Sequence, residues 1–177
     1  MKYPNLYKAF NRHIDLPIDV YLDLEGRLIH KKLGKKEFLF REGEVVKYLP
    51  FINDGLMINY IVEEDGEEHV IQIRGTGLWL GDLYSFFSDV RTRFNIQTCQ
   101  PTELLMINHE TFDYITKNHP VYEKFFRLNI QEAYVQTLNR IYNLHSATAK
   151  ERYLELIKNI PDLLDKIPHY LIASYLN

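Results

Sequence analysis

Glycines punctuate the sequence from residue 27 to residue 108, and short aromatic and β-branched segments lie between them. The glycines are Gly34, Gly43, Gly55, Gly66, Gly75, Gly77 and Gly81. The segments are EFLF (37–40), YLPFI (48–52), LMINYIV (56–62), HVIQI (69–73), FNIQT (94–98) and ELLMI (103–107). Many short strands at this turn spacing predict a closed or double-sheet antiparallel fold. Asp65-Gly66 between two apolar runs predicts a hairpin.

Helical patterns flank the predicted strands. Residues 18–25 follow Pro17 and predict a first helix. From Val121 to His145 the chain has no Gly or Pro, and Pro120 can open a helix at its first turn. At 1.5 Å per residue this helix would be roughly 37 Å long.

Further helices are predicted at the C-terminal end. Ser146 or Thr148 can N-cap a helix that ends before Pro161. Residues 163–167 and 169–176 predict two short helical pieces around Pro168.

The long helix carries two apolar stripes. One holds Ile130, Tyr134, Thr137, Ile141 and Leu144, and the other holds Phe125, Leu128, Val135, Leu138 and Tyr142. A surface helix needs only one such stripe to pack on its own domain. We therefore expect one stripe to pack on the strands and the other to form a seam with a second subunit.

Composition excludes several protein classes. The net charge of −3 gives no general attraction to nucleic acid or membranes. Cys99 is the single cysteine, which excludes an internal disulfide, a four-cysteine metal site and an iron–sulfur cluster; we expect it to be buried. No apolar run is long enough to span a membrane, so we predict a soluble cytoplasmic protein.

Four segments together resemble the Crp/Fnr family. They are residues 38–73, residues 79–98 (WLGDLYSFFSDVRTRFNIQT), the long helix at 120–145 and the tail from Glu151 onward. The resemblance implies an α+β fold: an antiparallel β jelly roll, or double-stranded β-helix, with N-terminal helices, a long C-terminal dimerisation helix and the start of a winged helix-turn-helix. It implies an effector domain at 1–118, a dimerisation helix at 119–145 and a truncated DNA-binding domain at 146–177.

The resemblance also implies a function: an effector-sensing bacterial transcription regulator, not an enzyme, that acts as a homodimer. In a full-length protein its partners would be DNA and RNA polymerase. We expect the turn and recognition helix to follow Asn177. Since basic and acidic residues balance in 146–177, this chain lacks the positive surface that phosphate contacts require.

Residues 79–98 resemble the phosphate-binding cassette of that family. Anion binding requires backbone amides and a cation. Gly81 permits close approach of the backbone, and the backbone amides of Leu83 and Tyr84 would point at the anion. Arg93 can supply the positive charge. In the family a Glu holds the ribose and an Arg followed by a small hydroxyl residue binds the phosphate. Those positions fall on Asp82, Thr92 and Arg93, so the Arg and the small residue are inverted.

Several alternatives stay open from the sequence. Asp82 is equally well an N-cap, and Arg93 can form an ion pair with Asp82 or Asp89. The effector is a cyclic nucleotide, another small anion, or absent. The chain as a whole could be a stand-alone small-ligand-binding module. A cupin-like enzyme would need an HxH pair and a Glu, and none of the seven His is so spaced.

The predicted homodimer seam lies on the long helix. Its residues are Leu128, Ile130, Val135, Leu138, Ile141 and Leu144.

Overall fold

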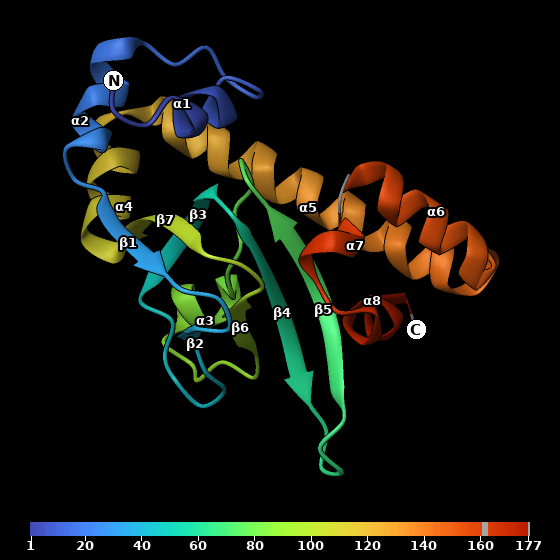
Figure 1. The fold of residues 1–177 in the computed structure, drawn as a ribbon. Coiled ribbons are helices and arrows are strands. Elements are labelled where there is room, and N and C mark those ends of the chain that lie inside the picture. The colour runs from blue at the N-terminus through green and yellow to red at the C-terminus, as the bar shows by residue number, and fades with distance from the viewer. Residues whose placement is uncertain (161–162, 177) are drawn as a thin grey trace.

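A computed structural model describes residues 1–160 and 163–176 (Figure 1). Pro161, Asp162 and Asn177, which the sequence analysis placed in the unit 146–177, lie outside the described residues. None of the described helices is both long and apolar enough to cross a membrane.

Two antiparallel sheets form a jelly-roll sandwich, as predicted. One sheet has the order β1-β7-β3 and the other β2-β6-β4-β5. The strands are β1 (Ile29–Leu33), β2 (Phe38–Phe40), β3 (Tyr48–Asp54), β4 (Leu56–Val62), β5 (Glu68–Gly75), β6 (Asn95–Thr98) and β7 (Thr102–Asn108). The hairpin at Asp65-Gly66 is confirmed, and Gly66 adopts the positive φ of 88° that favours glycine there.

The predicted strands are confirmed, and β1 was missed. Its sequence IHKKL exposes its three central residues to solvent, so it lacks the apolar run on which the prediction relied. By contrast, LMINYIV in β4 is apolar on both faces. Met57 belongs to the main core of the sandwich, while Leu56 and Ile58 on the opposite face of the strand belong to a second buried cluster under the C-terminal helices. Apolar and polar residues therefore do not alternate along β4.

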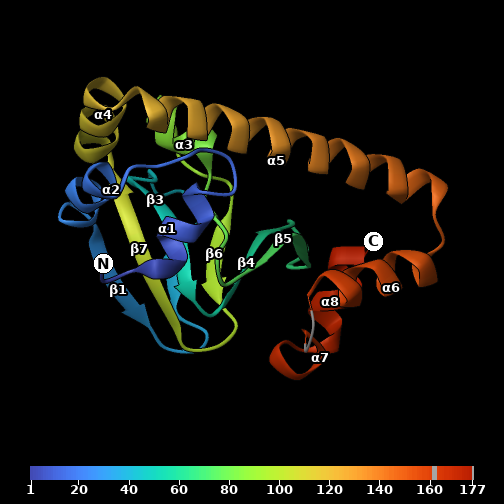
Figure 2. The same cartoon turned by 90° about the horizontal axis from the view of Figure 1, so that it is seen from above.

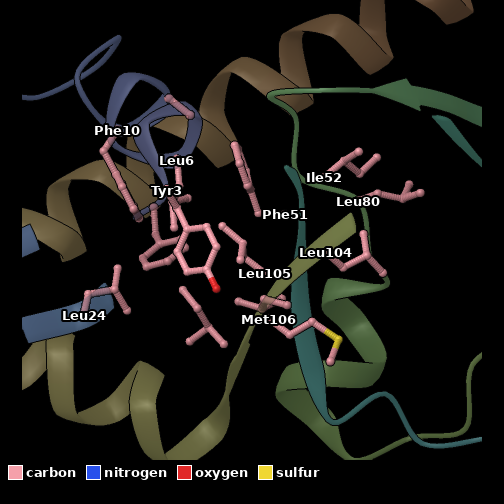
Figure 3. Close-up of a cluster of buried hydrophobic side chains, with 14 of the residues drawn as sticks. Tyr3, Leu6, Phe10, Leu24, Phe51, Ile52, Leu80, Leu104, Leu105 and Met106 are labelled. Carbon is pink, nitrogen blue, oxygen red and sulfur yellow. The ribbon is translucent and has the colours of Figure 1, made fainter. Parts of the chain in front are cut away.

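Helices close the sandwich at one end. They are α1 (Pro4–Phe10), α2 (Ile18–Glu25), α3 (Leu83–Ser88), α4 (His109–Asn118) and the long α5 (Pro120–Ser146). The first turns of α5 bury Tyr122, Phe125 and Phe126. They belong to the same buried cluster, the main core, as Phe10 of α1 and the strand residues Phe51 and Leu105, which Figure 3 labels. The N-terminal helices therefore fix the beginning of α5 to the sandwich.

The C-terminal helices pack back on the sheet β2-β6-β4-β5. They are α6 (Ala149–Asn159), α7 (Leu163–Lys166) and α8 (His169–Leu176). Thr148 caps α6 in a full capping box with Glu151. The second cluster consists of Leu56, Ile58, Tyr60, Val70, Ile73, Cys99, Leu156, Leu163, Ile167, Leu171 and Ile172. Cys99 is buried there as expected, and burial raises the pKa of its thiol to about 12.

Helix α5 extends past the edge of the sandwich (Figure 2). Of the two predicted stripes, only the first part of one packs on the domain, through Phe125 and Leu128. Beyond this point most apolar side chains of α5 face solvent. The exposed residues are Ile130, Tyr134, Val135, Leu138, Ile141 and Tyr142.

Candidate functional site

The predicted cassette is held together by its own hydrogen bonds. Asp82 is the N-cap of α3 and accepts a hydrogen bond from the backbone N–H of Ser85 at 3.1 Å. Its second carboxylate oxygen accepts from the Thr92 hydroxyl at 2.8 Å. Asp82 is 7% exposed and Thr92 is 3% exposed. Each is thus the other's partner inside the loop.

This arrangement predicts a structural role for Asp82. We expect Asp82→Ala to lower the free energy of unfolding by about 2 kcal/mol, since the helix loses its cap and the buried Thr92 hydroxyl loses its acceptor. Asp82→Asn keeps one acceptor oxygen for the Ser85 N–H, whereas its amide NH₂ replaces the oxygen that accepts from Thr92, so it should lose about 1 kcal/mol, less than Asp82→Ala. Urea unfolding of the ligand-free variants measures both values. Wild-type stability in Asp82→Ala would contradict the role.

Two of the predicted effector-binding residues face solvent. The side chain of Tyr84 is 68% exposed. Arg93 is also exposed, and its guanidinium makes no hydrogen bond or ion pair with residues 1–160 or 163–176, so the possible pairing with Asp82 or Asp89 is not seen in the structure. The structure therefore brings Gly81 and Leu83 to a pocket, but not Tyr84 or Arg93.

A pocket of about 100 Å³ lies between the cassette, β5 and α5. The cassette side contributes Trp79, Leu80, Gly81, Leu83 and Phe87, β3 contributes Leu49 and Pro50, β5 contributes Gln72 and Arg74, and α5 contributes Phe126, Asn129, Ile130 and Ala133. Residues of both the sandwich and the long helix thus line this pocket.

Arg74 is the charged residue of this pocket, and the sequence analysis did not identify it. Its side chain is half-buried, and burial lowers the pKa of the guanidinium. It forms no ion pair or hydrogen bond with any other part of the chain that the structure describes. A cation held in this way, next to an open cavity, is suited to bind an anion.

A β-bulge decides that Arg74 faces the pocket. The pairing of β4 with β5 shifts its register around Ile71. As a result Val70 and Ile73, three residues apart, both face the C-terminal helices. Gln72 and Arg74 face the pocket instead. Regular alternation from Val70 would have placed all the even-numbered residues of this segment on one face.

Comparisons with known proteins agree on one domain type. The sequence profile described as "cyclic nucleotide-binding domain" matches residues 30–119. No curated protein sequence is significantly similar to the chain.

Solved structures share the fold at low sequence identity. A cyclic nucleotide-binding domain from Methylobacillus flagellatus aligns with a TM-score of 0.70 at 14% identity, covering 80% of this chain and 83% of that one. The c-di-GMP-responsive global regulator CLP of Xanthomonas campestris gives 0.67 at 14%, covering 86% and 76%. The catabolite activator protein of Thermus thermophilus gives 0.61 at 16%, covering 82% and 70%. At these identities the likeness concerns the fold.

Proposed function

Because the chain belongs to the cyclic nucleotide-binding domain family, we propose that it is the effector-sensing part of a homodimeric transcription regulator of the Crp/Fnr type. Domains of this family are in general sensing domains rather than catalysts. The observation that carries the proposal is the pocket between the cassette, β5 and α5. A ligand there would contact the sandwich and the long helix at once. The similar structures of CLP and of the catabolite activator protein, both regulators by name, support this choice.

The exposed face of α5 supports a homodimer. Val135, Leu138 and Ile141 are each about half exposed, at 52%, 47% and 50%. These three residues recur at three-residue steps and form an exposed apolar stripe on α5, whereas Ile130, five residues before Val135, also lines the pocket. A second copy of the same helix would cover this stripe in a coiled-coil-like seam. Leu128 and Leu144, the other predicted seam residues, are half-buried at its ends.

Contacts from α5 to the C-terminal helices give a route for the signal. Arg140 donates hydrogen bonds to the backbone carbonyls of Ile71 in β5, at 2.5 Å, and of Tyr175 in α8, at 3.0 Å. Its guanidinium also lies 4.3 Å from the centre of the Tyr175 ring. A ligand that shifts α5 against β5 would therefore move α8 as well. In the proposed regulator this movement re-aims the DNA-binding domains, with DNA and RNA polymerase as partners.

The oligomeric state tests the proposed function. We expect the 177-residue chain to sediment as a dimer. Leu138→Glu or Ile141→Glu should each give a monomer. In the dimer the new carboxylate would be buried in the seam without a partner, and its desolvation would destabilise the dimer.

Gln136→Glu is the matched control, since it adds the same charge at an exposed position on the opposite side of the helix. It should remain dimeric. A monomeric wild type, or dimers in both seam variants, would refute the proposed seam.

A further inference from the structure

The charge of the pocket selects for one kind of ligand. Among its lining residues, Arg74 carries the single formal charge, and no carboxylate lines the cavity. A half-buried guanidinium without a partner has lost part of its hydration, and no hydrogen bond or ion pair replaces it. An anion that binds there would replace the lost hydration, whereas a cation would be repelled.

The other polar groups of the pocket are also unpaired. The side-chain amides of Gln72 and Asn129 make no hydrogen bond within the described part of the chain. The indole N–H of Trp79 is buried and has no hydrogen-bond partner among residues 1–160 and 163–176. Together with Arg74 these groups give the cavity several hydrogen-bond donors from the cassette, β5 and α5. Such a set matches an acceptor-rich group such as a carboxylate.

The remaining walls are apolar and the space is small. Leu83, Phe87, Phe126 and Ile130 line the cavity, whose volume is about 100 Å³. An engineered apolar cavity of about 150 Å³ is known to bind benzene, whereas pockets for drug-sized ligands measure about 300–1,000 Å³. The ligand body that fits is therefore one ring or a short acyl chain.

A cyclic nucleotide does not fit the groups that are present. The carboxylate that would hold its ribose belongs to Asp82, which is buried and bonded to Thr92 and Ser85. The position that would supply the phosphate-binding arginine holds Thr92, and Arg93 does not line the cavity. Of the positions that the family uses for the nucleotide, Asp82 and Thr92 are hydrogen-bonded to each other within the loop, and Arg93 lies outside the pocket.

We propose that the effector of this domain is a small organic monoanion with an apolar body, whose carboxylate is bound by Arg74. The inference rests on the proposed sensing function and specifies its ligand class. Arg74 and the amides of Gln72 and Asn129 bind the carboxylate, and the cassette and α5 enclose the apolar body. Ligand binding would then bring α5 and β5 together across the cavity.

Affinities of four simple probes test this proposal. Benzoate and hexanoate are titrated into the ¹⁵N-labelled 177-residue chain beside their neutral analogues benzamide and hexanamide. We expect at least one carboxylate to bind about tenfold or more tightly than its amide, since the charge-assisted hydrogen bonds need the anion. The largest shifts in the ¹H–¹⁵N spectrum should occur in residues that line the cavity. This comparison uses the wild type alone and does not depend on the folding of a variant.

Variants of Arg74 test whether this residue supplies the positive charge that binds the carboxylate. Arg74→Met keeps the aliphatic stem and should weaken carboxylate binding about tenfold or more while leaving the amides unchanged. Arg74→Lys keeps the positive charge and should retain most of the affinity. Arg93→Met removes an exposed arginine outside the cavity and is the matched control, with affinity within about twofold of wild type.

Three results would overturn the proposal: equal binding of acids and amides or no binding of either, unchanged carboxylate affinity in Arg74→Met, and tighter binding of cyclic AMP or cyclic GMP than of any carboxylate. Tight nucleotide binding would overturn the ligand class and leave the sensing function standing. A monomeric wild type would remove the proposed dimeric regulator whatever the pocket binds, so the two failures are distinguishable.

Discussion

Replacing Gly55 by alanine is expected to destabilise the protein by about 3 kcal/mol or more. Gly55 connects β3 to β4 with a φ of 126°, which side chains with a Cβ rarely adopt. The Cβ of an alanine there would lie 2.8 Å from the Cα of Thr102, in the backbone of the neighbouring β7. Strained φ costs about 1–2 kcal/mol and overpacking about 1–3 kcal/mol, and here neither can be relieved by a rotamer change. Urea unfolding followed by circular dichroism measures the loss.

Gly66→Ala separates the two contributions. Gly66 also has a positive φ, of 88°, but a Cβ there would meet no atom within 4 Å. This variant should lose only the conformational part, about 1–2 kcal/mol. If the two variants lost the same free energy, the close approach of β7 to Gly55 would not be what requires glycine at that turn.

Truncating Phe10 to alanine is expected to cost about 3–5 kcal/mol, the range for large side chains removed from a packed core. Phe10 is fully buried. Its ring centre lies 4.5 Å from that of Phe125, 5.2 Å from that of Tyr122 and 6.0 Å from that of Trp79. The cavity would therefore separate α1 from the first turns of α5 and from Trp79, which lines the pocket. Denaturant unfolding gives the loss, and weaker binding of any pocket ligand should accompany it.

Phe10→Leu is the control for this site. It fills most of the space and should cost about 1–2 kcal/mol. A loss below about 1 kcal/mol in Phe10→Ala would mean that the N-terminal helices do not fix α5 to the sandwich.

The ends and order of the elements follow from local chemistry. Glycines at turns, Pro120 at the start of α5 and the capping box at Thr148 act within a few residues, so the sequence predicts them. The fold class of an antiparallel jelly roll with N-terminal helices and a long C-terminal helix is confirmed. The predicted domain limits and the homodimer seam stay predictions.

The cassette was only partly predictable. Of its predicted effector-binding residues, Gly81 and Leu83 line the pocket, and their role in binding stays a prediction. The orientation of Arg93 and Tyr84 depends on how the loop closes through Asp82 and Thr92, a hydrogen bond between residues ten apart. The spacing of the residues in the sequence does not show that the side chains of Asp82 and Thr92 form this hydrogen bond.

The sequence by itself determined where most strands, turns and helices lie, because glycine, proline, capping residues and apolar periodicity act on near neighbours. The tertiary structure alone decided which side chains meet in the pocket. A single bulge around Ile71 changes which face of β5 Arg74 lies on, and the packing of α5 on the sandwich then places it in one pocket with Phe126 and Gly81. Such a shift depends on pairing with another strand, and no residue of β5 specifies it on its own.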